Sequence, residues 1–263
     1  MSGTPSEGTV KALYHYPIKG LSAQPLSEAP LVPGKGFPHD RVLALARAKT
    51  EFDPRAPKPL RKGMFHMLAR DASLARLKTH YDATADTLQI DNGAGPKTFS
   101  LGTESGANEA AAYISEALSL AQTDTPRLVR ADGHRFTDVS VVSETFMNAI
   151  SLINLASVHD LGARAGETLD PIRFRGNVYF DGWAAWDELS LEGRAIALGE
   201  TRLRVLLRTE RCAATTVNPQ TAERDVPVPR LLRESFGHAD CGIYAEVLRG
   251  GTIRAGDPIT VSD

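Results

Sequence analysis

The chain has 263 residues, a length at which one large β-rich domain or two small domains can bury a hydrophobic core without disulfide bonds. Hydrophobic residues make up 42% of the sequence and charged residues 24%, and the formal net charge is only -2. This balance argues against nucleic acid or a membrane surface as a partner.

The first ten residues, MSGTPSEGTV, contain neither the basic region nor the apolar region of a signal peptide. No stretch of the sequence reaches the uninterrupted apolar length of a membrane span. We therefore expect a cytoplasmic protein that does not associate with a membrane.

Short segments of strand character, separated by Gly and Pro, recur in the N-terminal half. The predicted strands are residues 10–16, 41–46, 87–90 and 97–101. A helix is predicted at residues 109–120, with Asn108 as its N-cap. The proline-rich stretch 50–63 predicts an exposed loop.

The C-terminal half predicts six strands that could close a barrel and two helices. The strands are residues 150–155, 177–180, 195–198, 203–207, 243–248 and 258–261. One helix spans 158–165, with Ser157 as N-cap and Gly166 as its end, and the other spans 228–236 and ends at Gly237. A boundary near residues 121–125 divides the chain into domains 10–122 and 123–263, and the fold class is a mixed, β-rich α+β protein.

The two cysteines are too few for a disulfide framework and need separate explanations. Cys212 lies in the polar segment TERCAATTVNP, where the adjacent Arg211 favours the thiolate, the form that acts as nucleophile and soft-metal ligand. The alternative is an inert, buried cysteine, and Cys241 receives that interpretation. For Cys212 the residues alone leave both alternatives open.

Four basic residues stand beside turns or strand ends. They are Lys19 in YPIKG, Arg41 in PHDR, and Arg173 and Arg175 in RFRGN. Such positions suit an anionic ligand such as a phosphate, because arginine can donate two hydrogen bonds to it. A solvated surface charge is the alternative for each of them.

Several enzyme classes have no motif support. The seven histidines show no zinc-ligand spacing, and there is no CxxC pair. The sequence also contains no serine-hydrolase elbow, no P-loop and no dinucleotide fingerprint.

Ordered blocks along nearly the whole chain resemble the MOSC family, named for the C-terminal domain of molybdenum cofactor sulfurase. The N-terminal block LYHYPIKGLSAQPLSEAPLVPGKGFPHDR is similar to the N-terminal β-barrel domain that accompanies some members. The blocks SLINLASVHDL, RFRGNVYF, WDEL, RCAATTVNPQT and GTIRAGDPITV are similar to the MOSC domain proper. The resemblance implies an N-terminal MOSC-associated β-barrel domain at residues 10–122 and a MOSC β-barrel domain at residues 123–263.

The resemblance also implies a molybdenum cofactor (molybdopterin) and assigns its contacts. Cys212 would be the metal ligand, with Asp138 as a second catalytic group near the metal. Cofactor-binding residues would be Lys19, Arg41 and Arg175 at the phosphate, with Asn177 and Arg211 at further contacts. The sequence differs from the family pattern in three segments, RFRGN, TTVNP and TAER. These differences affect the expected geometry of substrate binding more than the expected binding of the cofactor.

The activity implied by the resemblance is reduction of N-hydroxylated compounds, as in the mitochondrial amidoxime reducing component and bacterial MOSC reductases. The sequence has no ferredoxin-type cysteine cluster and no flavin fingerprint, so a separate electron-transfer protein is expected as partner. One alternative is a carrier module that binds molybdenum cofactor or sulfur without turnover. Another is a domain that has kept the fold and lost the metal.

Overall fold

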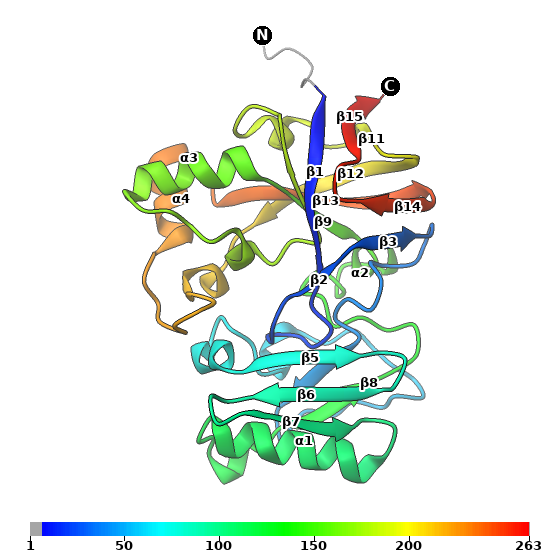
Figure 1. Ribbon diagram of the computed structural model, residues 1–263, viewed down its shortest axis with the longest axis vertical. Coiled ribbons are helices and arrows are strands. Elements are labelled where there is room, and N and C mark those ends of the chain that lie inside the picture. The colour runs from blue at the N-terminus through cyan, green and yellow to red at the C-terminus, as the bar shows by residue number, and fades with distance from the viewer. Residues whose placement is uncertain (1–6, 263) are drawn as a thin grey trace.

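The computed structural model describes residues 7–262 as two stacked bodies, with both ends of the described chain in the upper one (Figure 1). Seven strands of the upper body form a closed ring of hydrogen-bonded neighbours. In ring order they are β1 (Gly8–His15), β10 (Val178–Asp181), β9 (Ile150–Asn154), β13 (Asp240–Arg249), β12 (Thr201–Glu210), β11 (Ala195–Leu198) and β15 (Pro258–Ser262). The strand-rich fold class and a closed barrel are therefore confirmed.

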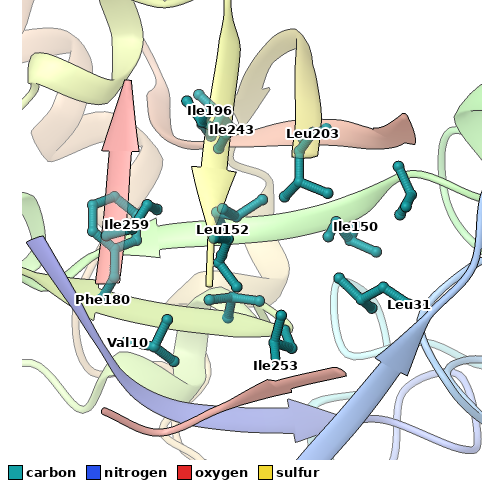
Figure 2. Packing of buried hydrophobic residues seen from close by; sticks show 14 of the residues in the cluster. Val10, Leu31, Ile150, Leu152, Phe180, Ile196, Leu203, Ile243, Ile253 and Ile259 are labelled. Atoms are coloured by element: carbon teal, nitrogen blue, oxygen red, sulfur yellow. The ribbon is translucent and has the colours of Figure 1, made fainter. Parts of the chain in front are cut away.

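The barrel is filled with apolar side chains. Along β12, Leu203 and Val205 point inward while Arg202 and Arg204 are exposed, which is the alternation of a strand with one buried face. Figure 2 shows the buried cluster, to which every barrel strand contributes. Because small barrels are packed with side chains, a ligand has to bind outside the barrel interior.

The barrel closes with one strand more than the six predicted from the C-terminal half. β1 pairs with β10 on one side and with β15 on the other, so the N-terminal segment fills the gap. Conversely, β8 (Arg127–Arg130) pairs with β4 (Leu43–Ala46) in the lower body. The two bodies thus exchange strands, and the division into domains 10–122 and 123–263 stays a prediction.

The lower body contains two small sheets and one long helix (Figure 1). β5 (Lys78–Asp82), β6 (Thr87–Asp91) and β7 (Pro96–Ser100) form a meander, and β4 with β8 forms a second ladder. Helix α1 (Glu104–Ala117) packs Ala110 and Ile114 into their shared core. Within the described residues these pairings make two separate sheets, so the predicted barrel-like ring is not continuous here.

The remaining elements are short. β2 (Gln24–Leu26) pairs antiparallel with the end of β1, and β3 (Glu28–Leu31) pairs with β14 (Gly251–Arg254). Helix α2 spans Glu144–Met147, α3 spans Leu155–Ala165 and α4 spans Val228–Phe236. Strands β2, β3, β5, β8 and β14 were not predicted, because such short segments are defined by distant partners and not by their own apolar pattern.

Helix α1 begins earlier than predicted. Thr103 is its N-cap, and Thr103 Oγ1 accepts a hydrogen bond from Gly106 N at 3.1 Å. A Cβ on Gly106 would stand 1.9 Å from the Ser100 carbonyl oxygen, so this first turn requires glycine. The prediction of Asn108 as the cap was therefore wrong, because the first turn of the helix, Glu104 to Gly106, has no apolar periodicity that would reveal it in the sequence.

Helix α3 is the crossover between the parallel strands β9 and β10, and its cap also differs from the prediction. Asn154 caps it by accepting from Ala156 N at 3.1 Å. Ser157, the predicted cap, is buried and donates from Oγ to the Glu188 carboxylate at 2.8 Å. The predicted end at Gly166 is confirmed, since Gly166 has φ 71°.

Within the described residues, no helix combines the length and apolarity that crossing a lipid bilayer requires. The cytoplasmic location stays a prediction.

We expect Leu152→Ala in β9 to lower the free energy of unfolding by about 2 to 5 kcal/mol, because it leaves a cavity in a packed core. Leu152 is 0% exposed, whereas Leu248, at 43%, supplies the control Leu248→Ala. That variant should change stability by less than about 1 kcal/mol. Chemical denaturation measures both, and equal losses would contradict the packing described here.

Candidate functional site

A cleft lies where the barrel meets the lower body, and residues from both line it. The family resemblance assigned a role to seven residues, and all seven line this cleft: Lys19, Arg41, Asp138, Arg175, Asn177, Arg211 and Cys212. A second cavity of about 240 Å³, more apolar, shares Arg173, Arg175 and Ala214 with it. The cleft therefore combines basic side chains, a thiol and room beside them.

Lys19 is placed by the segment that leaves β1 and enters the lower body. Its backbone N–H donates to the Leu43 carbonyl at 2.9 Å, which ties this segment to β4. Lys19 Nζ donates to the Phe136 carbonyl at 2.9 Å and to the Asp138 carboxylate. Burial lowers the pKa of Lys19 more than Asp138 raises it. An ammonium has three donors, so one remains for a ligand in the cleft.

Arg41 and Arg175 lie together over the buried ring of Tyr16. Their guanidinium carbons are 5.0 and 4.2 Å from the ring centroid, and Arg41 Nη2 donates to the Arg175 carbonyl at 3.0 Å. Both residues have φ 51°, a left-handed backbone that directs these side chains out of the neighbouring strands. The predicted strand at 41–46 therefore begins only at Leu43.

The two guanidinium groups differ in their counter-charges. Burial works against the charge of Arg41, but the adjacent Asp40 outweighs it and raises the pKa of Arg41. Arg175 donates from Nη1 to the Leu21 carbonyl at 2.8 Å, and no carboxylate pairs with it among residues 7–262. Burial, together with Arg41, lowers the pKa of Arg175 to about 10. An anion bound here would relieve this repulsion.

Several buried polar atoms along the cleft have no hydrogen-bond partner within the described chain. They are Thr137 Oγ1, Ser151 Oγ, Arg173 Nε, Arg175 Nη2 and Thr209 Oγ1. Leaving such atoms unpaired destabilises a fold by about 1 to 3 kcal/mol each, so native proteins normally satisfy them. Their number in one cleft indicates a polar ligand.

Cys212 lies two residues after Glu210, the last residue of β12, and is half-buried. Its carbonyl accepts from the backbone N–H of Thr215 at 3.0 Å and from the Thr215 hydroxyl at 2.9 Å, which fixes the turn behind it. Cys212 lines the cleft and also a second, outer cavity. Cys241 is fully buried in β13, and burial raises its pKa to about 12. Its predicted burial is therefore confirmed, and its lack of reactivity stays a prediction.

Asp138 joins the two lysines of the site. It accepts from Lys19 Nζ, and its other carboxylate oxygen lies 3.5 Å from Lys62 Nζ. Burial would raise the pKa of Asp138, but Lys19 and then Lys62 outweigh it and lower the pKa to about 2. Asp138 is therefore a carboxylate at neutral pH and keeps both ammonium groups at the mouth of the cleft.

A cation close to Cys212 that the sequence did not indicate is Lys62. It lies in the short turn Lys62–Met64 of the proline-rich loop and lines the same outer cavity as Cys212. Arg211, the cation that the sequence did indicate, donates from Nε and Nη1 to the carbonyls of Cys241 and Phe174, at 2.6 and 2.8 Å. The Arg211 guanidinium thus links the backbone at Cys241 to the backbone at Phe174 beside the cleft.

The side chain of Asn177 also hydrogen-bonds to the protein backbone. Its Nδ2 donates to the Tyr14 carbonyl at 3.2 Å, and its Oδ1 accepts from Ser151 N at 3.1 Å. It thereby ties β1 to β9 at the cleft wall.

Sequence reasoning missed Lys62 and the hydroxyls of Thr137, Ser151 and Thr209. Lys62 sits in a loop without periodicity, and the hydroxyl residues occupy ordinary polar positions. Only their convergence on the cleft distinguishes them.

We expect one thiol of the cofactor-free, folded protein to react with a thiol reagent such as Ellman's reagent. Cys212 is half-buried, whereas Cys241 is 0% exposed and should react only after unfolding. Cys212→Ala should abolish the fast phase and Cys241→Ala should retain it. Equal rates for both thiols would contradict the described burial.

Comparison with known proteins identifies the C-terminal part of the chain. Residues 131–260 match the MOSC domain family. The chain is 29% identical to mitochondrial amidoxime-reducing component 1 of Xenopus laevis over 146 residues, 51% of this chain and 42% of the relative. It is also 29% identical to mitochondrial amidoxime reducing component 2 of Rattus norvegicus over 122 residues, 42% of this chain and 36% of the relative. The matches thus span less than half of the length of these relatives.

Comparison with solved structures finds similarity to several chains, two of which are YuaD and YiiM. The YuaD protein from Bacillus subtilis has a TM-score of 0.46 at 15% identity, covering 98% of this chain and 96% of its own. YiiM from Geobacillus stearothermophilus has a TM-score of 0.36 at 18% identity, covering 43% of this chain and 54% of its own.

Proposed function

Because residues 131–260 form a MOSC domain, we propose that the protein binds the molybdenum cofactor in the cleft and reduces N-hydroxylated compounds. The similarity to amidoxime-reducing components over about half of the chain supports a reductase. The names of those relatives state an amidoxime-reducing activity for them, and we propose an activity of this type for the present chain.

The observation that carries the proposal is that a cationic floor, formed by Lys19, Arg41 and Arg175, shares one cleft with the Cys212 thiol, and that Arg175 has no carboxylate partner among residues 7–262. A phosphate brings two negative charges, and Lys19, Arg41 and Arg175 offer donors for it. A pterin ring brings several donors and acceptors, which the unpaired hydroxyls of Thr137, Ser151 and Thr209 can satisfy. A thiolate is a soft ligand suited to the metal. The residues therefore fit the cofactor.

In this assignment Cys212 holds the metal, and the basic residues hold the phosphate. The molybdenum centre would supply the two-electron reduction of the N–O bond, which releases water and consumes two protons. Asp138 keeps Lys19 and Lys62 charged and in place on either side of the cleft mouth. Arg211, the residue before Cys212, donates a hydrogen bond to the Phe174 carbonyl. This bond would keep the Cys212 sulfur at a fixed distance from Lys19, Arg41 and Arg175.

The proposal includes a separate electron-transfer protein as partner. An iron–sulfur cluster in either body would need several cysteine ligands, and the sequence has only two cysteines. Cys241 is buried away from any such role.

Protein purified from a host that makes the cofactor should contain close to one molybdenum per chain. Cys212→Ala should lose the metal and the reduction of benzamidoxime by a chemical electron donor, whereas Cys241→Ala should retain both. Metal analysis and product formation measure the two properties separately. Equal loss of molybdenum in both variants would contradict the assignment of Cys212.

The same experiment separates the reductase from a carrier. Bound molybdenum without any benzamidoxime turnover would favour a module that carries cofactor or sulfur. Absence of molybdenum from the unsubstituted protein would favour a domain that has kept the fold and lost the metal.

A further inference from the structure

The outer cavity beside Cys212 is a separate space of about 570 Å³, within the range of about 300 to 1,000 Å³ typical of small-molecule sites. Its lining contains none of Lys19, Arg41 and Arg175, and Cys212 lines both this cavity and the cleft. Its charged lining residues are Lys62, Glu210, Arg211, Arg230 and Arg233. Cations outnumber carboxylates around this sulfur.

Lys62 is the cation that the proline-rich loop contributes to this cavity. Its turn is anchored because the Met64 carbonyl accepts from Arg47 N at 3.0 Å and from Thr50 Oγ1 at 2.6 Å. Asp138 lies 3.5 Å from Nζ, and Cys212 lines the same cavity. The side chain is 42% exposed, so its charge also faces the outer cavity.

Arg230 and Arg233 line the same cavity from helix α4. Arg230 Nε lies 2.7 Å from Glu234, and Arg233 Nη2 lies 3.4 Å from Glu210. Both pairs are solvent-exposed and hence weak. A guanidinium has five N–H donors, and each pair engages one nitrogen, so both arginines keep donors for an incoming anion.

We propose that the outer cavity binds the anionic group of the substrate, so that the preferred substrates are N-hydroxylated compounds carrying a carboxylate or a phosphate. Lys62 from the loop and Arg230 with Arg233 from helix α4 would hold that group while the N-hydroxyl end points to Cys212. This inference rests on the proposed reductase function. Lys62, Arg230 and Arg233 would determine which substrates bind, a role separate from that of the cofactor-binding residues.

The first test uses the cofactor-free full chain and does not depend on activity. Cys212 is alkylated with anionic iodoacetate or neutral iodoacetamide, and peptide mass spectrometry gives the two rates. The ratio of iodoacetate to iodoacetamide rate should fall about two- to fivefold for each of Lys62→Met, Arg230→Gln and Arg233→Gln. Lys58→Met, an exposed lysine on the same loop that lies outside the cavity, should leave the ratio unchanged.

The second test uses the cofactor-loaded protein with benzamidoxime and 4-carboxybenzamidoxime. The carboxylate substrate should have the higher kcat/KM, and the preference should shrink in the Lys62, Arg230 and Arg233 variants but not in Lys58→Met. A ratio that is the same in all proteins, in either test, overturns the proposal. If neither substrate is reduced, the reductase assignment fails, while the alkylation ratio still decides whether the cavity binds anions.

Discussion

The stacking of two arginines on one buried tyrosine determines the character of the cleft. Arg41 and Arg175 both contact the ring of Tyr16, and only Arg41 has a carboxylate partner among the described residues. Two like charges in a partly buried place repel each other unless a ligand supplies negative charge. Burial and the neighbouring Arg41 together lower the pKa of Arg175. An anionic ligand bound here would offset the repulsion between the two guanidinium groups.

The exchange of strands between the bodies makes this stacking possible. Tyr16 follows β1, a barrel strand, yet its N–H donates to Asp40 in the lower body at 2.8 Å. Its hydroxyl lies 3.1 Å from that of Tyr179 in β10. The ring is thus held from both sides, and the arginines of two distant segments meet on it. Cys212, just after β12, faces the same space from a third segment.

Local pattern predicted much of this architecture, and distant contacts account for the rest. Helix α4 and strand β11 have the predicted bounds, because their apolar periodicity and end signals are intrinsic to the segments. The role of β1 in the barrel could not be predicted, since its partners lie far away in the chain. Lys62 was missed for the same reason, and the orientation of Arg211 depends on carbonyls of β13 and the Phe174 turn. The seven predicted residues do share one cleft, and their individual roles stay predictions.

The most direct test of the cationic floor is molybdenum retention by Arg175→Gln, compared with Arg175→Lys and the exposed control Arg55→Gln. Each protein, purified from a cofactor-making host, is passed through gel filtration at low and high salt, and molybdenum per chain is measured. Loss of one charged donor to a phosphate costs about 1.5 to 3 kcal/mol, or roughly tenfold or more in affinity. Arg175→Gln should therefore release cofactor, increasingly with salt, while Arg175→Lys retains more of it and Arg55→Gln behaves like the unsubstituted protein. Equal retention by all proteins at every salt concentration would contradict phosphate binding at Arg175.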